Sequence, residues 1–140
     1  MLHLMKLAVG VRDLTHLRDL QAGRARTAPP LRHLTRNQPR RAAEVLDGGS
    51  IYWVIGGALL VRQRILDIRP APDADGTART ALLLDPTLVP VAARPVKPFQ
   101  GWRYLAAAAA PADLAAPAAG RWTEELPAAL QRELRALGLL

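Results

Sequence analysis

Short apolar runs bounded by Gly and Pro cover most of the first 105 residues, and their pattern predicts β-strands. The clearest run is Ser50–Ile55, whose β-branched and aromatic side chains are typical of a buried strand. Gly56 and Gly57 follow it directly and predict a tight hairpin into a long strand. We therefore expect strands at 2–9, 31–36, 50–55, 58–68 and 79–85, and short extended pieces such as 89–94 between the later prolines.

Two helices are predicted within this β-rich part of the chain. Asp13 is a suitable N-cap for the first, which Gly23 would end, with Leu14, Leu17 and either Leu20 or Gln21 on its inner face. A basic loop would follow at 24–30. The second helix begins at Pro39, where the absent N–H costs nothing, and continues through Arg40–Asp47 until Gly48 and Gly49 stop it.

The C-terminal quarter differs in composition from the rest. Residues 106–121 are rich in Ala and Pro and read as a connector. A last helix follows, with a leucine stripe at helical spacing formed by Leu126, Leu130, Leu134 and Leu137. We expect a single α+β domain, with a curved, mixed or mostly antiparallel sheet flanked by about three helices. Its parts would be an α+β core at 1–105, the connector at 106–121, and an amphipathic helix at 122–140 packed on the core.

Charge is distributed unevenly along the chain. The net charge of +7 at pH 7 comes from 19 basic and 12 acidic residues, and almost all the basic ones are Arg. Residues 1–43 contain nine basic and two acidic residues, whereas residues 44–140 contain ten of each. A GC-rich genome explains Arg in place of Lys, but it does not explain a segment that lacks carboxylates. The asymmetry therefore points to an anionic partner, such as nucleic acid or an acidic surface.

Several classes of chemistry lack support in the sequence. The chain has no Cys, so disulfides, thiolate nucleophiles and cysteine-ligated metals are excluded. His3, His16 and His33 do not have metal-ligand spacing, and Ser50, the only Ser, lies outside a nucleophile elbow. The glycine pairs at 48–49 and 56–57 do not lie in the strand-to-helix turn of a phosphate-binding loop. We expect no cofactor, no metal, no membrane segment and a cytoplasmic location.

Arginines near predicted element ends are the best candidates for an anion-binding site. Arg36, Arg40 and Arg41 surround the predicted start of the second helix, where backbone N–H groups favour phosphate. Arg62 and Arg64 are two residues apart and share a strand face. Trp102 and Arg103 would contribute at the rim, although both Trp53 and Trp102 are also typical of core anchors. The expected site is therefore Arg36, Arg40, Arg41, Arg62, Arg64, Trp102 and Arg103.

Three segments carry a family resemblance. They are LTRNQPRRAAEVLDGGSIYWVIGGALLVRQRILDI at 34–68, LLLDPTLVPV at 82–91 and PFQGWRYL at 98–105. Together with the opening LHLMKLAVGV, they resemble a family of small bacterial proteins known as domain-of-unknown-function family 1489. The resemblance covers roughly residues 1–105, implies no catalytic residues, and leaves the C-terminal stretch as the variable part. The element order also resembles the first elements of PUA/ASCH-type pseudobarrels, which are RNA- or nucleotide-related modules. Their Gly-x-Lys-x-x-Glu-x-Arg signature, however, does not follow Gly48.

The function expected from these features is a non-catalytic nucleic-acid-binding module that holds RNA on an Arg-rich face. One alternative is a small enzyme for a nucleotide-like or other anionic substrate, with Ser50, Glu44, His33 or Asp47 in a pocket beside the arginines. A second alternative is a protein-interaction subunit that docks through the C-terminal leucine stripe.

Overall fold

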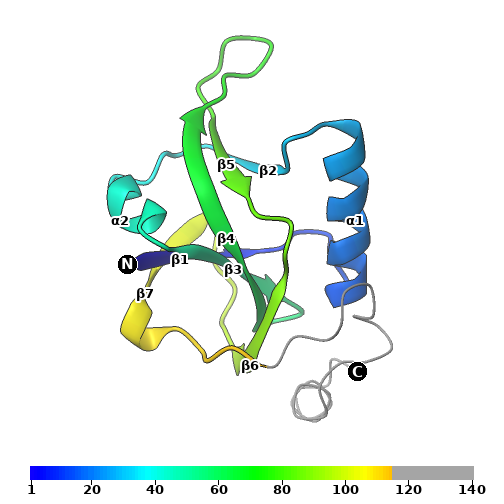
Figure 1. Ribbon diagram of the computed structural model, residues 1–140, viewed down its shortest axis with the longest axis vertical. Coiled ribbons are helices and arrows are strands. Elements are labelled where there is room, and N and C mark those ends of the chain that lie inside the picture. Colours follow the sequence, from blue (N-terminus) through cyan, green and yellow to red (C-terminus); the bar gives the residue numbers. More distant parts are fainter. Residues whose placement is uncertain (115–140) are drawn as a thin grey trace.

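The computed structural model describes residues 1–114 (Figure 1). Within that range the chain forms two α-helices, seven strands and one 3-10 turn. In order along the chain they are β1 (Leu2–Leu7), α1 (Leu14–Thr27), β2 (Arg32–Thr35), α2 (Ala42–Leu46), β3 (Ser50–Ile55), β4 (Ala58–Pro70), β5 (Thr80–Leu84), β6 (Val89–Pro95), β7 (Trp102–Ala106) and η1 (Ala107–Ala109). No helix in this range is long and apolar enough to cross a membrane.

The strands form one mixed, mostly antiparallel sheet in the order β2-β5-β4-β3-β1-β7, and β6 also pairs with β4. Only β1 and β3 run parallel. The long strand β4 pairs with β3 along one edge, while β6 and β5 follow each other along its other edge. Because register shifts interrupt all three of these pairings, the sheet bends around β4. It does not close, and β2 and β7 remain its two ends.

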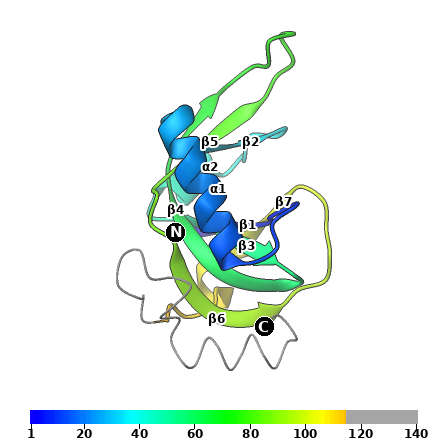
Figure 2. The same ribbon diagram turned by 90° about the vertical axis from the view of Figure 1, so that its right-hand side faces the viewer.

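The core lies on both faces of β3, all six residues of which are buried. Ile51, Trp53 and Ile55 face a larger cluster that includes Leu14 and Leu17 of α1. Tyr52 and Val54 face a second cluster on the opposite side of the sheet. Figure 2 shows α1 running alongside the sheet, as these contacts require. The α+β class and the mixed, mostly antiparallel sheet are therefore confirmed, and the fully buried strand at 50–55 lies where it was predicted.

Both helices differ in extent from the prediction. α1 continues past Gly23 to Thr27, so most of the predicted loop at 24–30 is helical. A glycine within a helix costs only about 1 kcal/mol, and the good helix formers around it outweigh that cost. Pro29 ends the helix instead, because the residue before a proline avoids helical backbone angles. α2 covers only Ala42–Leu46, which is shorter than the predicted Arg40–Asp47.

The first residues of the Ala/Pro-rich stretch pack on the core. The amide of Ala92 in β6 donates to the carbonyl of Ala112 at 2.8 Å, and the amide of Leu114 donates to the carbonyl of Pro90 at 2.9 Å. Asp113 forms a two-point ion pair with Arg62 of β4. The rest of the predicted connector, at 115–121, and the predicted third helix at 122–140 lie outside the described residues.

The turn between α2 and β3 requires glycine for two reasons. Gly48 has a φ of +80°, which L side chains rarely adopt. Gly49 lies so close to the neighbouring backbone that an added Cβ would be 2.2 Å from the Leu2 carbonyl oxygen and 2.3 Å from that of Val45. The close approach brings β1, α2 and β3 together at one point.

We expect Gly49→Ala to destabilise the protein by roughly 3 kcal/mol or more, because backbone oxygens cannot move aside as a flexible side chain would. Gly23→Ala is the matched control. An added Cβ there meets no atom within 4 Å, so this change should stabilise α1 by about 0.5–1 kcal/mol. Urea unfolding of both variants measures the two effects, and equal free energies of unfolding would contradict the close packing at Gly49.

Candidate functional site

A lysine occupies an apolar face of β1. Lys6 follows Leu2 and Leu4 at alternate positions, and it lies opposite Trp53 of β3 and Trp102 of β7 in the strand register. Cross-strand partners share a face of the sheet, so Lys6 lies between two indole side chains. Burial lowers the pKa of Lys6. Among the described residues its ammonium makes only a long 3.5 Å contact, with the carbonyl of Leu7, and no ion pair.

A groove of about 780 Å³ lies between the two ends of the open sheet. The end of β2, the start of β7, Lys6 and the loop 71–79 line it, and this loop projects from the body of the molecule (Figures 1 and 2). The lining residues are Lys6, Leu34, Thr35, Arg36, Asn37, Asp73, Arg79, Gln100, Gly101 and Trp102. We call this cavity the β2–β7 groove.

The β2–β7 groove carries excess positive charge. Its single carboxylate, Asp73, is 2.8 Å from Arg79 and is neutralised by it. Arg36 is exposed and has no carboxylate partner among the described residues, and Lys6 has none either. Trp102 is half-buried, and its indole N–H donates to the carbonyl of Asn37 at 3.1 Å. This arrangement provides two unpaired cations beside an accessible aromatic ring.

A smaller cavity of about 160 Å³, here called the His33 pocket, lies on the other side of Lys6. Leu17, Leu31 and Leu84 form part of its apolar wall, and none of its lining residues is Asp or Glu. Its polar lining consists of Lys6, Gln21, Arg24, Arg32, His33 and Trp53. A shallow depression formed by Arg24, Ala28, Arg32, His33 and Leu34 continues from it, and Leu34 also lines the β2–β7 groove.

His33 is the most perturbed group of this pocket. Its imidazole packs edge-on against Trp53, with ring centroids 5.2 Å apart. Burial first, and then the charges of Lys6 and Arg24, lower the pKa of His33 to about 4. The side chain is therefore neutral at pH 7. Its buried Nε2 atom has no hydrogen-bond partner among the described residues.

A buried amide pair holds the wall behind His33. Gln21 of α1 and Gln63 of β4 exchange two hydrogen bonds of 2.9 and 2.6 Å. Gln63 also accepts the indole N–H of Trp53 at 2.9 Å and donates to the carbonyl of Asp85 at 3.0 Å. Because every member of this network is satisfied, it fixes the orientation of the Trp53 ring.

The structure brings only two of the seven predicted site residues, Arg36 and Trp102, into the β2–β7 groove. Arg41 forms an ion pair with Glu44 instead, and its guanidinium lies 5.7 Å from the centre of the Tyr104 ring. Arg40 is exposed near the start of α2. That helix has only one turn, Ala42–Leu46, and the expected anion site at its N-terminus stays a prediction.

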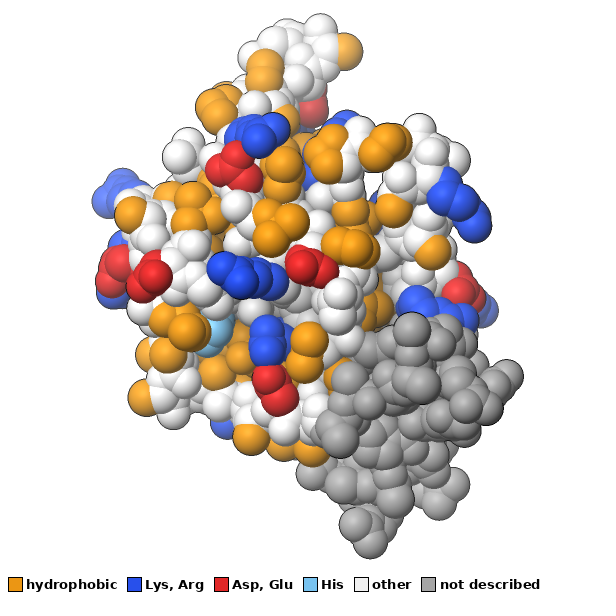
Figure 3. Space-filling view, in the orientation of Figure 1, with side chains coloured by type: hydrophobic (Ala, Val, Ile, Leu, Met, Phe, Trp, Pro, Cys, Tyr) orange, Lys and Arg blue, Asp and Glu red, His pale blue; other side chains and the backbone are white. Residues whose placement is uncertain are grey.

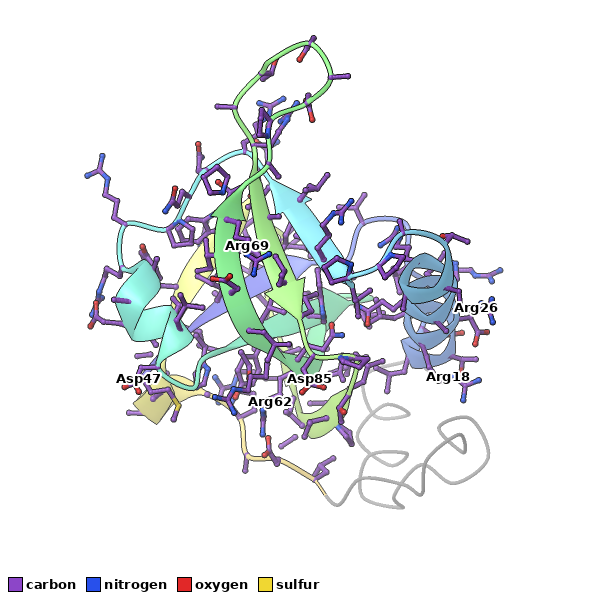
Figure 4. All side chains as sticks on the ribbon, turned by 45° about the horizontal axis from the view of Figure 1, so that its top comes forward. Arg18, Arg26, Asp47, Arg62, Arg69 and Asp85 are labelled. Carbon is purple, nitrogen blue, oxygen red and sulfur yellow. The ribbon has the colours of Figure 1, made fainter. Side chains whose placement is uncertain are left out.

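The other predicted arginines have local roles. The guanidinium of Arg62 donates to Asp113 at 2.7 and 2.6 Å and to the Ser50 hydroxyl at 3.1 Å (Figure 4 labels Arg62). Arg64 is exposed on β4, and Arg103 lies 4.9 Å above the Phe99 ring. On the face seen in Figure 3, basic side chains are dispersed and several lie beside acidic ones.

Four cations of the two cavities lie in the basic first third of the chain: Lys6, Arg24, Arg32 and Arg36. Only Arg36 was expected at the site. The signal for Lys6 is visible in the sequence, because a lysine replaces the third leucine of an apolar alternation that begins with Leu2 and Leu4. Arg24 and Arg32 carry no comparable signal, since the distance between α1 and β2 depends on tertiary packing.

The residues proposed for an enzymatic site do not meet in one pocket. Ser50 is fully buried at the start of β3 and receives a hydrogen bond from Arg62. Glu44 pairs with Arg41, and Asp47 lies 3.7 Å from the N-terminal amine. Of the four candidates, only His33 lines a cavity beside arginines. Within residues 1–114, no cluster of three His, Cys, Asp or Glu side chains could hold a metal ion.

Comparison with known protein families finds a match. The model of the family described as "Protein of unknown function (DUF1489)" matches residues 4–140, so the resemblance extends beyond residue 105 and through the C-terminal stretch. No curated protein and no solved structure matches the chain.

We predict that His33 makes stability depend on pH in mildly acidic solution. In the unfolded chain the imidazole has a pKa of 6.5 and is mostly protonated below that pH. In the folded protein it stays mostly neutral until the pH falls to about 4. Stability should therefore fall as the pH decreases through this range, by about 2 kcal/mol between about pH 7 and about pH 5. His33→Phe keeps an aromatic ring against Trp53 and should remove that part of the slope.

Urea unfolding of the two proteins across this range measures the difference, and an NMR titration of the His33 ring measures its pKa directly. Parallel pH profiles for wild type and variant would contradict the burial of a neutral imidazole.

Proposed function

The chain belongs to the DUF1489 family of proteins of unknown function, and we propose that it is a non-catalytic RNA-binding protein that holds a single strand in the β2–β7 groove. The observation that carries the proposal is the pair of unneutralised cations, Lys6 and Arg36, beside the half-buried Trp102 ring. A bacterial, cytoplasmic setting and a PUA-like pseudobarrel belong to the same proposal. The long bent strand β4, paired along both edges, supports the last of these.

The charge of the groove favours phosphate as the bound group. Two cations without carboxylate partners stabilise an anion, and Arg24 and Arg32 extend the positive surface beyond the groove. Each phosphate that a protein cation neutralises releases counterions, so its contribution to the affinity decreases as the salt concentration rises. A repeating anionic backbone fits an elongated positive surface better than a small isolated anion does.

The recessed position of Trp102 favours a single strand over a duplex. Bases in a double helix are stacked on one another, and an indole inside a groove cannot reach their faces. In a single strand the bases turn outward, and stacking on an aromatic ring stabilises the complex by about 1–3 kcal/mol per base. RNA loops and ends therefore fit the chemistry of this groove.

The enzymatic alternative rests on His33, the single candidate that lines a cavity. Beside His33, the lining of this pocket offers Lys6, two arginines and one amide but no carboxylate or hydroxyl, so among its side chains only Lys6 could join His33 in general acid–base catalysis. The side chains of this pocket fit a role in binding better than a role in catalysis. The leucine stripe of the protein-interaction alternative lies outside the described residues.

We expect the protein to bind a fluorescent oligouridine of about ten nucleotides at low salt, with a log affinity that falls linearly with log salt. Arg32→Glu combined with Arg36→Glu should weaken binding by roughly a hundredfold at about 50 mM salt. The slope should become shallower by about 1.4, since each lost phosphate contact on a single strand contributes about 0.7. Fluorescence anisotropy across a salt series measures both quantities.

The matched control is Arg12→Glu combined with Arg26→Glu, which changes the net charge by the same amount. Both residues are exposed and line neither cavity, and Arg26 lies on the outer side of α1 (Figure 4). The control should retain most of the wild-type affinity. If both double variants lose affinity equally, the binding is a property of net charge and not of the groove. If the wild type does not bind at low salt, the proposed function is wrong.

A further inference from the structure

We propose that the His33 pocket binds the terminal phosphomonoester of the RNA strand, so that the protein recognises a phosphorylated RNA end. This inference rests on the proposed function, because the strand that carries the phosphate would lie in the adjoining β2–β7 groove. The two cavities share Lys6, and the depression formed by Arg24, Arg32, His33 and Leu34 connects them on the other side.

The charge around the pocket suits a terminal phosphate better than an internal one. Lys6, Arg24 and Arg32 contribute three positive charges to one small cavity without an acidic side chain in its lining. An internal phosphodiester carries one negative charge. A phosphomonoester carries about 1.5 to 2 negative charges at pH 7 and has three strong acceptor oxygens. Three cations around one group match the larger charge.

The size of the pocket also favours the end of a strand. Its volume of about 160 Å³ is well below the roughly 300–1,000 Å³ of pockets that enclose whole drug-sized ligands. It has room for a phosphate group but not for a chain that enters and leaves. The apolar wall of Leu17, Leu31 and Leu84 and the fixed Trp53 ring bound it.

His33 lines the pocket and carries an unused hydrogen-bonding atom. Its Nε2 is buried and has no partner among residues 1–114. A phosphate oxygen beside this nitrogen would give it one. The charges of Lys6 and Arg24, which now oppose protonation of the imidazole, would be offset by the bound anion. Binding of a phosphate should therefore raise the pKa of His33, which gives a readout specific to this pocket.

The test compares three oligouridines of about eight nucleotides that differ only in their ends: 5′-phosphate, 3′-phosphate or two hydroxyls. We expect one phosphorylated form to bind at least about tenfold more tightly than the hydroxyl form at about 100 mM salt, as charge-assisted hydrogen bonds predict. The arm that shows the gain identifies the end. Arg24→Gln should abolish the preference, whereas Arg26→Gln, two residues further along α1 and outside the pocket, should preserve it.

A second measurement does not depend on the groove. NMR titration of His33 with and without uridine monophosphate should show a higher pKa in the presence of the nucleotide for the wild type, and no change with the nucleotide for Arg24→Gln. Equal affinity for all three oligonucleotides, or a wild-type His33 pKa that the nucleotide does not raise, would overturn the inference and leave the proposed function standing. If none of the oligonucleotides binds, the proposed function itself fails, and this inference with it.

Discussion

The pairing of β4 along both edges is the constraint on which the rest of the structure depends. A buried strand needs partners for its backbone hydrogen-bonding groups. In β4, residues 58–64 pair with β3 on one side, residues 58–62 pair with β6 on the other, and residues 65–70 then pair with β5. The register shifts in these pairings bend the sheet. As a consequence, β2 and β7 end up at opposite ends of an open sheet, and the groove lies between them.

The polar network at Gln63 connects this strand to the candidate site. Gln63 is fully buried on β4, and its side chain bonds Gln21 of α1, Trp53 of β3 and the backbone of Asp85. A buried amide is stable only when its donors and acceptors are satisfied, so these three elements are held in one relative position. The Trp53 ring, against which His33 packs, is thereby fixed as a wall of the pocket.

The charge asymmetry of the sequence indicates which segment supplies the cations of the two cavities, but it does not indicate which individual arginines do so. Lys6, Arg24, Arg32 and Arg36, the cations of the two cavities that have no carboxylate partner within residues 1–114, all come from residues 1–43, where the excess charge lies. Arg41 and Arg62, which are as prominent in the sequence, are instead held by Glu44 and Asp113. Asp113 is distant from Arg62 along the chain, and such a pairing cannot be read from spacing. Local runs of arginine therefore do not identify by themselves which arginines line a cavity.

The sequence by itself determined the α+β class, the buried strand at 50–55, the Gly-Gly hairpin after it and the location of the excess charge. These features depend on local periodicity, turn geometry and composition, which act over a few residues. Only the tertiary structure decided that the sheet stays open, that Lys6 lies between Trp53 and Trp102, and that His33 and Arg24 line the same pocket. Those contacts join residues far apart in the chain, and the bend of β4 sets the distances between them.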